Sequence, residues 1–128
     1  RDLPHSLIDA FHATLEAAAD ADLLLHVVDS ASHARDQQMS DVNKVLEEIG
    51  ASKVRQLIVW NKIDLTAAAP GIERDEYGNI ARVRISARSG EGLELLRESL
   101  AEYALAKAET LQDELAAAAR DAQPEYIS

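Results

Sequence analysis

The apolar residues of this chain fall into short runs and helical stripes separated by polar segments. Between residues 4 and 19 they recur every four positions, a spacing that predicts an amphipathic helix. The uninterrupted apolar run over 22–29 shows no alternation, so it predicts a strand buried on both faces, as in a parallel sheet. The next periodic stretch, 33–49, predicts a second helix that ends at Gly50.

The second half of the chain continues with shorter elements. The apolar run over 54–60 predicts a second strand. Residues 66–79 mix glycine, proline and charges, and predict a long surface connection with a turn near its end. The alternating segment 80–85 predicts a third strand. Its two arginines, Arg82 and Arg84, share one face, which indicates a strand at the sheet edge or one exposed on one side.

A long helix is predicted from residue 91 to about residue 118, with an Ala-rich stretch of high helix propensity after residue 101. Helices that alternate with strands predict an α/β fold with a parallel sheet and right-handed crossovers. We therefore expect three mostly parallel strands with flanking helices. Ligands in such sheets bind beyond the carboxyl ends of the strands, which directs attention to the segments that follow each strand.

Composition narrows the possible functions. The 128 residues carry 23 acidic and 13 basic side chains, giving a formal net charge of −10. This acidic surplus argues against stand-alone nucleic-acid binding, although it leaves room for a local basic patch. No apolar run approaches the roughly 20 residues of a membrane helix, so no membrane partner is expected. The chain has no cysteine, and its four histidines lack metal-ligand spacing, so no metal site is expected.

Two polar motifs directly follow predicted strands. The strand over 54–60 leads into Asn61-Lys62-Ile63-Asp64. The strand over 80–85 leads into Ser86-Ala87-Arg88, followed by a turn that contains Gly90 and Gly92. Taken alone, the first motif could be a polar turn between a strand and a helix. Because the carboxyl ends of parallel strands meet at one edge of a sheet, however, the two motifs are expected to form one site.

The chemistry of this pair suits a guanine base. A carboxylate at Asp64 can accept hydrogen bonds from both N1–H and the N2 amino group. The amide of Asn61 can serve the N7/O6 edge, and the backbone N–H of Ala87 can donate to O6. The aliphatic stem of Lys62 can lie along the base and the ribose. Adenine reverses the donors and acceptors, so such a site would reject it. The predicted guanine-binding residues are Asn61, Lys62, Asp64, Ser86, Ala87 and Arg88.

Taken together, the two motifs resemble the fourth and fifth G-boxes of Ras-like translation-factor GTPases. The segments 1–16, 21–29 and 42–49 also resemble HflX-type GTPases, in the stretch that follows their third G-box. This resemblance covers residues 1–103 and implies a partial Ras-like P-loop NTPase fold. Residues 1–103 would be the carboxyl-terminal part of a G domain, and 104–128 an Ala-rich helical extension with a loose tail.

The resemblance also implies a function. Members of that family are cytoplasmic, bind GTP and GDP with Mg²⁺, associate with the large ribosomal subunit, and act in ribosome splitting or rescue. The sequence leaves two alternatives: a non-enzymatic interaction domain derived from a G domain, or part of another translation-factor-class GTPase.

Two other family motifs are not found in these 128 residues. The sequence contains neither Gly-x-x-x-x-Gly-Lys-Ser/Thr, which cradles the phosphates and supplies a Mg²⁺ ligand, nor an Asp-x-x-Gly box. In the family that box would lie a few residues before Arg1, so we expect the chain to be a piece of a longer protein.

Without those motifs we assign no catalytic residue and no Mg²⁺ ligand in this sequence. We expect very weak guanine binding and no hydrolysis by the chain alone. In a Ras-like sheet the strand over 22–29 would have a further neighbour, so we also expect an unpaired edge there and self-association through it.

Overall fold

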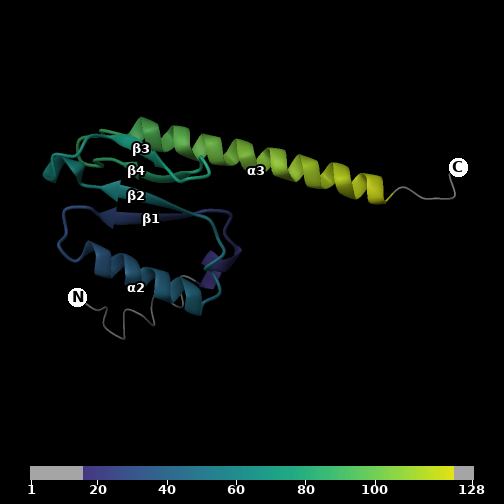
Figure 1. Ribbon diagram of the computed structural model, residues 1–128, viewed down its shortest axis with the longest axis horizontal. Helices are drawn as coiled ribbons and strands as arrows, with labels where there is room; N and C mark the ends of the chain where they lie inside the picture. Colours follow the sequence, from purple (N-terminus) through teal and green to yellow (C-terminus); the bar gives the residue numbers. More distant parts are fainter. Residues whose placement is uncertain (1–15, 123–128) are drawn as a thin grey trace, which may run out of the picture. The chain divides into compact units, whose positions relative to one another are not determined.

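The computed structural model describes residues 16–122, which form an α/β fold (Figure 1). In chain order its elements are η1 (Glu16–Asp20), β1 (Leu24–Asp29), α2 (Arg35–Glu48), β2 (Gln56–Asn61), η2 (Ile63–Leu65), β3 (Gly71–Arg74), β4 (Ile80–Arg84) and α3 (Leu93–Asp121). The predicted fold class is confirmed. The helix expected over 4–19 lies mostly outside the described residues, and its last part is the 3₁₀ helix η1.

The four strands form one sheet in the order β1-β2-β4-β3. β1 pairs with β2, and β2 with β4, in parallel, whereas β3 runs antiparallel to β4. The sheet thus has one strand more than the sequence predicted, because β3 lies inside the segment 66–79 that was expected to be a connection. This extra strand also places β4 in the interior of the sheet, so the edge position considered for it was wrong.

Polar contacts of the hairpin explain why β3 forms. The guanidinium of Arg84 in β4 lies 2.7 Å from a carboxylate oxygen of Glu73 in β3, and it also donates to the carbonyl of Ala69. In the turn, the carboxylate of Asp75 accepts hydrogen bonds from the backbone N–H groups of Tyr77 and Asn79. The strand is therefore stabilised by cross-strand charge pairing and turn chemistry, which a hydropathy pattern does not report.

Strand β1 is less buried than its composition predicted. Val28 is 3% exposed, but Leu25 is 45% exposed and Val27 is 61% exposed on the opposite face. Among the described residues β1 pairs only with β2, so it is an edge strand of this sheet. The expectation of burial on both faces was therefore wrong, whereas the expectation of an unpaired edge agrees with the described part of the chain.

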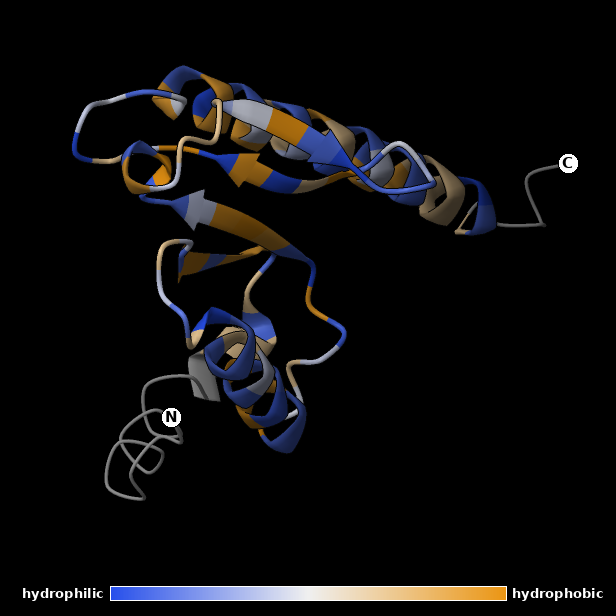
Figure 2. Cartoon of the chain, turned by 60° about the vertical axis from the view of Figure 1, so that its left-hand side comes forward, coloured by the Kyte–Doolittle hydropathy of each residue, from blue (hydrophilic) through white to orange (hydrophobic). Residues whose placement is uncertain are grey.

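Helix α2 packs alongside β1 (Figure 1). Leu46 packs with Ala18 and Ala51 in a buried cluster. The helix ends in a Schellman motif, because Gly50, at φ +77°, donates to the carbonyl of Glu47 while Ala51 donates to that of Leu46. Figure 2 shows the most hydrophobic residues concentrated on the strands, whereas α2 turns a polar face outward.

The chain divides into two compact units, residues 1–96 and 97–128, and the boundary falls inside α3. The first unit contains the whole sheet. In the second unit, the described part of α3 is largely exposed, including Leu105, Leu111 and Leu115. No helix in the described part of the chain is both long and apolar enough to cross a membrane. The division at residues 103 and 104 into a G-domain part and an extension stays a prediction.

Candidate functional site

The parallel pairing of β2 and β4 brings the two polar motifs to the same edge of the sheet. Trp60 is aligned with Arg84, so both strands end at the same level. Past their ends the backbones remain joined, because Ile85 donates to the carbonyl of Trp60 at 2.9 Å and Ile63 donates to that of Ile85 at 3.2 Å. Ile63 and Ile85 are also buried and anchor the two loops from below.

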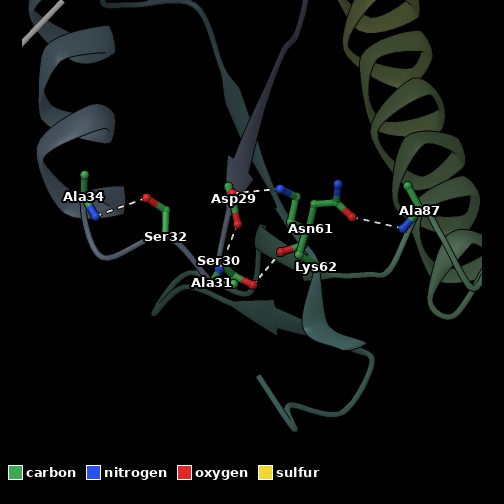
Figure 3. Close-up of polar contacts among 8 residues, drawn as sticks. All are labelled: Asp29, Ser30, Ala31, Ser32, Ala34, Asn61, Lys62 and Ala87. Atoms are coloured by element: carbon green, nitrogen blue, oxygen red, sulfur yellow. Dashed lines mark hydrogen bonds and ion pairs between the residues drawn. The ribbon is translucent and has the colours of Figure 1, made fainter. Parts of the chain in front are cut away.

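Asn61 and Ala87 are in direct contact across the two loops (Figure 3). The backbone N–H of Ala87 donates to the side-chain oxygen of Asn61 at 3.0 Å. This bond directs the amide nitrogen of Asn61 away from Ala87, as a donor suited to an acceptor such as N7 of guanine. The N–H of Ala87, which the sequence analysis assigned to O6, is thus shared with Asn61. Guanine O6 would have to share or replace that contact.

Ser86 connects the second loop to the carboxylate of Asp64. Its hydroxyl donates to Asp64 Oδ1 at 2.9 Å and accepts the backbone N–H of Ser89 at 3.1 Å, while its carbonyl accepts the N–H of Gly90 at 2.8 Å. Ser86 is fully buried, whereas Asp64 is exposed. The buried serine therefore fixes an outward-facing carboxylate whose second oxygen remains an acceptor.

Lys62 adopts a left-handed backbone conformation, with φ at 69°. Such a conformation costs a non-glycine residue about 1–2 kcal/mol, so the surrounding contacts must hold it in place. Its ammonium lies 2.9 Å from a carboxylate oxygen of Asp29, at the end of β1 (Figure 3). This hydrogen bond holds the pKa of Asp29 below its ordinary value, and the backbone N–H of Ala31 acts in the same direction.

Four of the six predicted residues are thus joined in two pairs, Asn61 with Ala87 and Asp64 with Ser86. Lys62 contacts β1 rather than the second loop. Arg88 is exposed, and among residues 16–122 it makes no hydrogen bond to the other five. Within the same residues, no three histidine or acidic side chains come together as a metal site.

Two residues outside the predicted set, Asp29 and Ser30, also contact these loops. Asp29 is the last residue of β1, and its side chain binds Lys62. The buried Ser30 donates both its backbone N–H and its hydroxyl to the carbonyl of Asn61. The register of the sheet, which pairs Asp29 with Asn61, is the signal that could have indicated these contacts.

Comparison with known proteins shows to which proteins this chain is related. No protein-family model matches the chain. A protein of Escherichia coli strain K12 named GTPase HflX is 46% identical over 103 residues, which is 80% of this chain and 24% of that protein. The protein of that name in Lacrimispora saccharolytica is 45% identical over 96 residues, or 75% of this chain and 22% of the relative. This chain is related to the HflX-type GTPases.

The relationship extends along most of the sequence. The protein named GTPase HflX in Gluconacetobacter diazotrophicus is 36% identical over 116 residues, covering 90% of this chain and 25% of that relative. The chain therefore spans about a quarter of the length of the HflX-type proteins it matches. The resemblance seen in the sequence is confirmed, and the fold agrees with part of a P-loop GTPase domain.

Proposed function

We propose that this chain carries the guanine-recognition loops of an HflX-like GTPase. The observation that carries the proposal is the junction of two loops from neighbouring parallel strands, with Asp64 exposed above the buried Ser86 and Asn61 bonded to Ala87. Asp64 would accept N1–H and the N2 amino group of guanine. The amide nitrogen of Asn61 would donate to N7, and the stem of Lys62 would lie beneath the base.

The finer family functions belong to the same proposal and rest on the relationship to HflX-type proteins. In a protein that also supplies a phosphate loop, GTP would be the substrate and Mg²⁺ would neutralise its phosphates. The residues of this chain would select the base and would take no part in bond cleavage. We also infer, from the relationship alone, a role on the large ribosomal subunit in the cytoplasm.

The energetics predict weak binding by the chain alone. The base offers a few hydrogen bonds of about 1–3 kcal/mol each when a charged partner takes part, and the loss of translational and rotational freedom opposes them. Much of the affinity for a nucleotide comes from backbone N–H groups, a lysine and a metal around the phosphates. Residues 1–128 should therefore bind GDP at best weakly and should not hydrolyse GTP.

A base-exchange experiment tests the proposal. GDP, ADP and xanthosine diphosphate are titrated into the chain with Mg²⁺, with backbone amide NMR shifts of the two loops as the readout. The amide shifts of the wild-type chain should respond to GDP at lower concentrations than to ADP. Asp64→Asn should lose at least tenfold in GDP affinity, because it removes charge-assisted hydrogen bonds worth about 1.5–3 kcal/mol each. It should also favour the xanthine base, whose O2 accepts from the new amide.

Asp75→Asn serves as the matched control, since it removes the same charge in the β3–β4 turn and retains the acceptor oxygen there. If the wild-type chain responds equally to GDP and ADP, or if Asp64→Asn behaves like Asp75→Asn, the guanine assignment is wrong.

The alternative function, a non-enzymatic interaction domain, is favoured by a different observation. Leu25 and Val27 are exposed on β1, and a groove of about 370 Å³ runs between β1 and α2, lined in part by Met39 and Val42. An edge strand with exposed apolar residues is a template for pairing with another chain. We propose self-association through β1 as the first form of such an interaction.

A further inference from the structure

The end of strand β1 contacts the end of β2 and the loop after it, which carry Asn61 and Lys62, at two separate points (Figure 3). Ser30 donates its backbone N–H, at 3.0 Å, and its hydroxyl to the carbonyl of Asn61. One residue earlier, Asp29 Oδ2 lies 2.9 Å from the ammonium of Lys62. These contacts join segments more than thirty positions apart, and they follow from the register that places Asp29 beside Asn61.

The carboxylate of Asp29 is held in place by a contact that does not involve Lys62. Its other oxygen, Oδ1, accepts the backbone N–H of Ala31 at 3.0 Å, which fixes the side chain in a turn at the strand end. Ser30 is held from its other side as well, because Arg35 of α2 donates to its carbonyl at 2.8 Å. The end of β1 is therefore a preorganised acceptor, and the flexible partner in the pair is Lys62.

The consequence for Lys62 is geometric. Its backbone belongs to the loop after β2, while its ammonium is anchored at the end of β1. The four-carbon stem therefore spans the carboxyl edge of the sheet from one strand to the next. An exposed lysine without such an anchor would sample many rotamers, and ordering it on binding would oppose association.

We propose that Asp29 is a positioning residue for guanine recognition, which holds the stem of Lys62 across the sheet edge as a preformed floor for the base. This proposal rests on the proposed function. It assigns to Asp29 no contact with the nucleotide, because its effect passes through Lys62. The edge strand β1 thereby becomes part of the site, although none of its residues lies in either recognition motif.

The central variant is Asp29→Asn. It keeps an oxygen that can accept the N–H of Ala31 and replaces the oxygen that binds the ammonium with a donor. We expect up to about a fivefold loss in guanine affinity, because a solvent-exposed ion pair contributes little. Asp22→Asn is the control, because it makes the same change in charge near the opposite end of β1 and should alter the affinity less than twofold.

A double-substitution cycle separates positioning from a general structural role. In a chain that already carries Lys62→Met, adding Asp29→Asn should change guanine affinity no further, because the connecting residue has been removed. A merely structural Asp29 would lower the affinity equally in both backgrounds. The pair itself is measured without nucleotide, by following the Asp29 carboxyl with pH by NMR. Its pKa should be below the ordinary value in the wild-type chain and should rise in Lys62→Met.

The outcomes separate this proposal from the proposed function. If Asp64→Asn abolishes the preference for GDP over ADP but Asp29→Asn behaves like Asp22→Asn, the positioning role is refuted and the guanine site stands. An unchanged Asp29 pKa in Lys62→Met also refutes the positioning role. If the wild-type chain shows no preference for GDP over ADP, both proposals fail, whatever the NMR titration of the pair shows.

Discussion

Replacement of Gly92 by alanine should destabilise the chain severely, and a second glycine two positions earlier provides the control. Both glycines lie in the turn between β4 and α3, with φ at +87° for Gly90 and +81° for Gly92. A Cβ added at Gly90 would meet nothing within 4 Å, whereas one at Gly92 would lie 2.5 Å from the carbonyl oxygen of Arg84 and 3.0 Å from a methyl group of Ile85. The two positions therefore share their backbone strain and differ in the available space.

The magnitudes follow from these two terms. A positive φ costs alanine about 1–2 kcal/mol, and this term should be the whole effect of Gly90→Ala. At Gly92 the obstructing atom belongs to the backbone of β4 and cannot rotate away, so a further 1–3 kcal/mol of overpacking is expected, giving roughly 2–5 kcal/mol in total. Since domains of this size are stable by only about 5–15 kcal/mol, Gly92→Ala should remove a large part of the free energy of unfolding.

Urea denaturation followed by circular dichroism measures the difference. With a slope of about 1–3 kcal/mol per molar urea, the midpoint of Gly92→Ala should lie roughly 1 M below that of Gly90→Ala. The displacement should also reach the candidate site, because the carbonyl of Ile85 accepts a hydrogen bond from Ile63 in the loop after β2. Equal midpoints for the two variants would mean that β4 accommodates the methyl group, and would refute the reasoning.

Two further predictions concern β1. Val27→Lys adds a charge to the exposed face of the edge strand, so the variant should show a lower apparent mass in light scattering than the self-associated wild-type chain. A wild-type chain that is monomeric at all concentrations would contradict this. Burial lowers the pKa of His26 below its ordinary value of 6.5, although the hydrogen bond with Gln56 acts in the opposite direction. The folded state therefore binds fewer protons than the unfolded state. Stability should rise with pH towards 6.5, and His26→Gln should flatten that slope in urea midpoints; an unchanged slope would exclude His26 as its source.

Hydrophobic patterning predicted β1 and β2 from uninterrupted apolar runs, β4 from alternation, and α2 and α3 from helical spacing of apolar residues. It failed at β3, whose only large apolar residue is Ile72 and whose pairing depends on Glu73 and Arg84. It also failed to describe the exposure of β1. An apolar run does not reveal whether a strand has neighbours on one side or on both.

The motifs predicted which two loops come together, and the assignment of those loops to guanine stays a prediction. Asn61, Asp64, Ser86 and Ala87 come together because β2 and β4 are parallel neighbours, and parallel strands end at one edge of the sheet. Asp29 and Ser30 were missed because their contacts depend on the residue-by-residue register of β1 against β2. Register is set by packing and pairing across the sheet, and no local pattern around Asp29 encodes it.

The parallel pairing of β1, β2 and β4 also governs the order in which the site can assemble. The β3–β4 ladder closes through a short turn, whereas β1 and β2 must enclose α2 before they pair. During synthesis from the amino end, β1 and β2 emerge well before β4. Until then Asn61 lacks its contact with Ala87, and Leu57 and Val59, both buried in the folded sheet, lack the neighbouring strand. The contact between Asn61 and Ala87 can therefore form only after Ala87 has left the ribosome, and until then β2 lacks its neighbour β4.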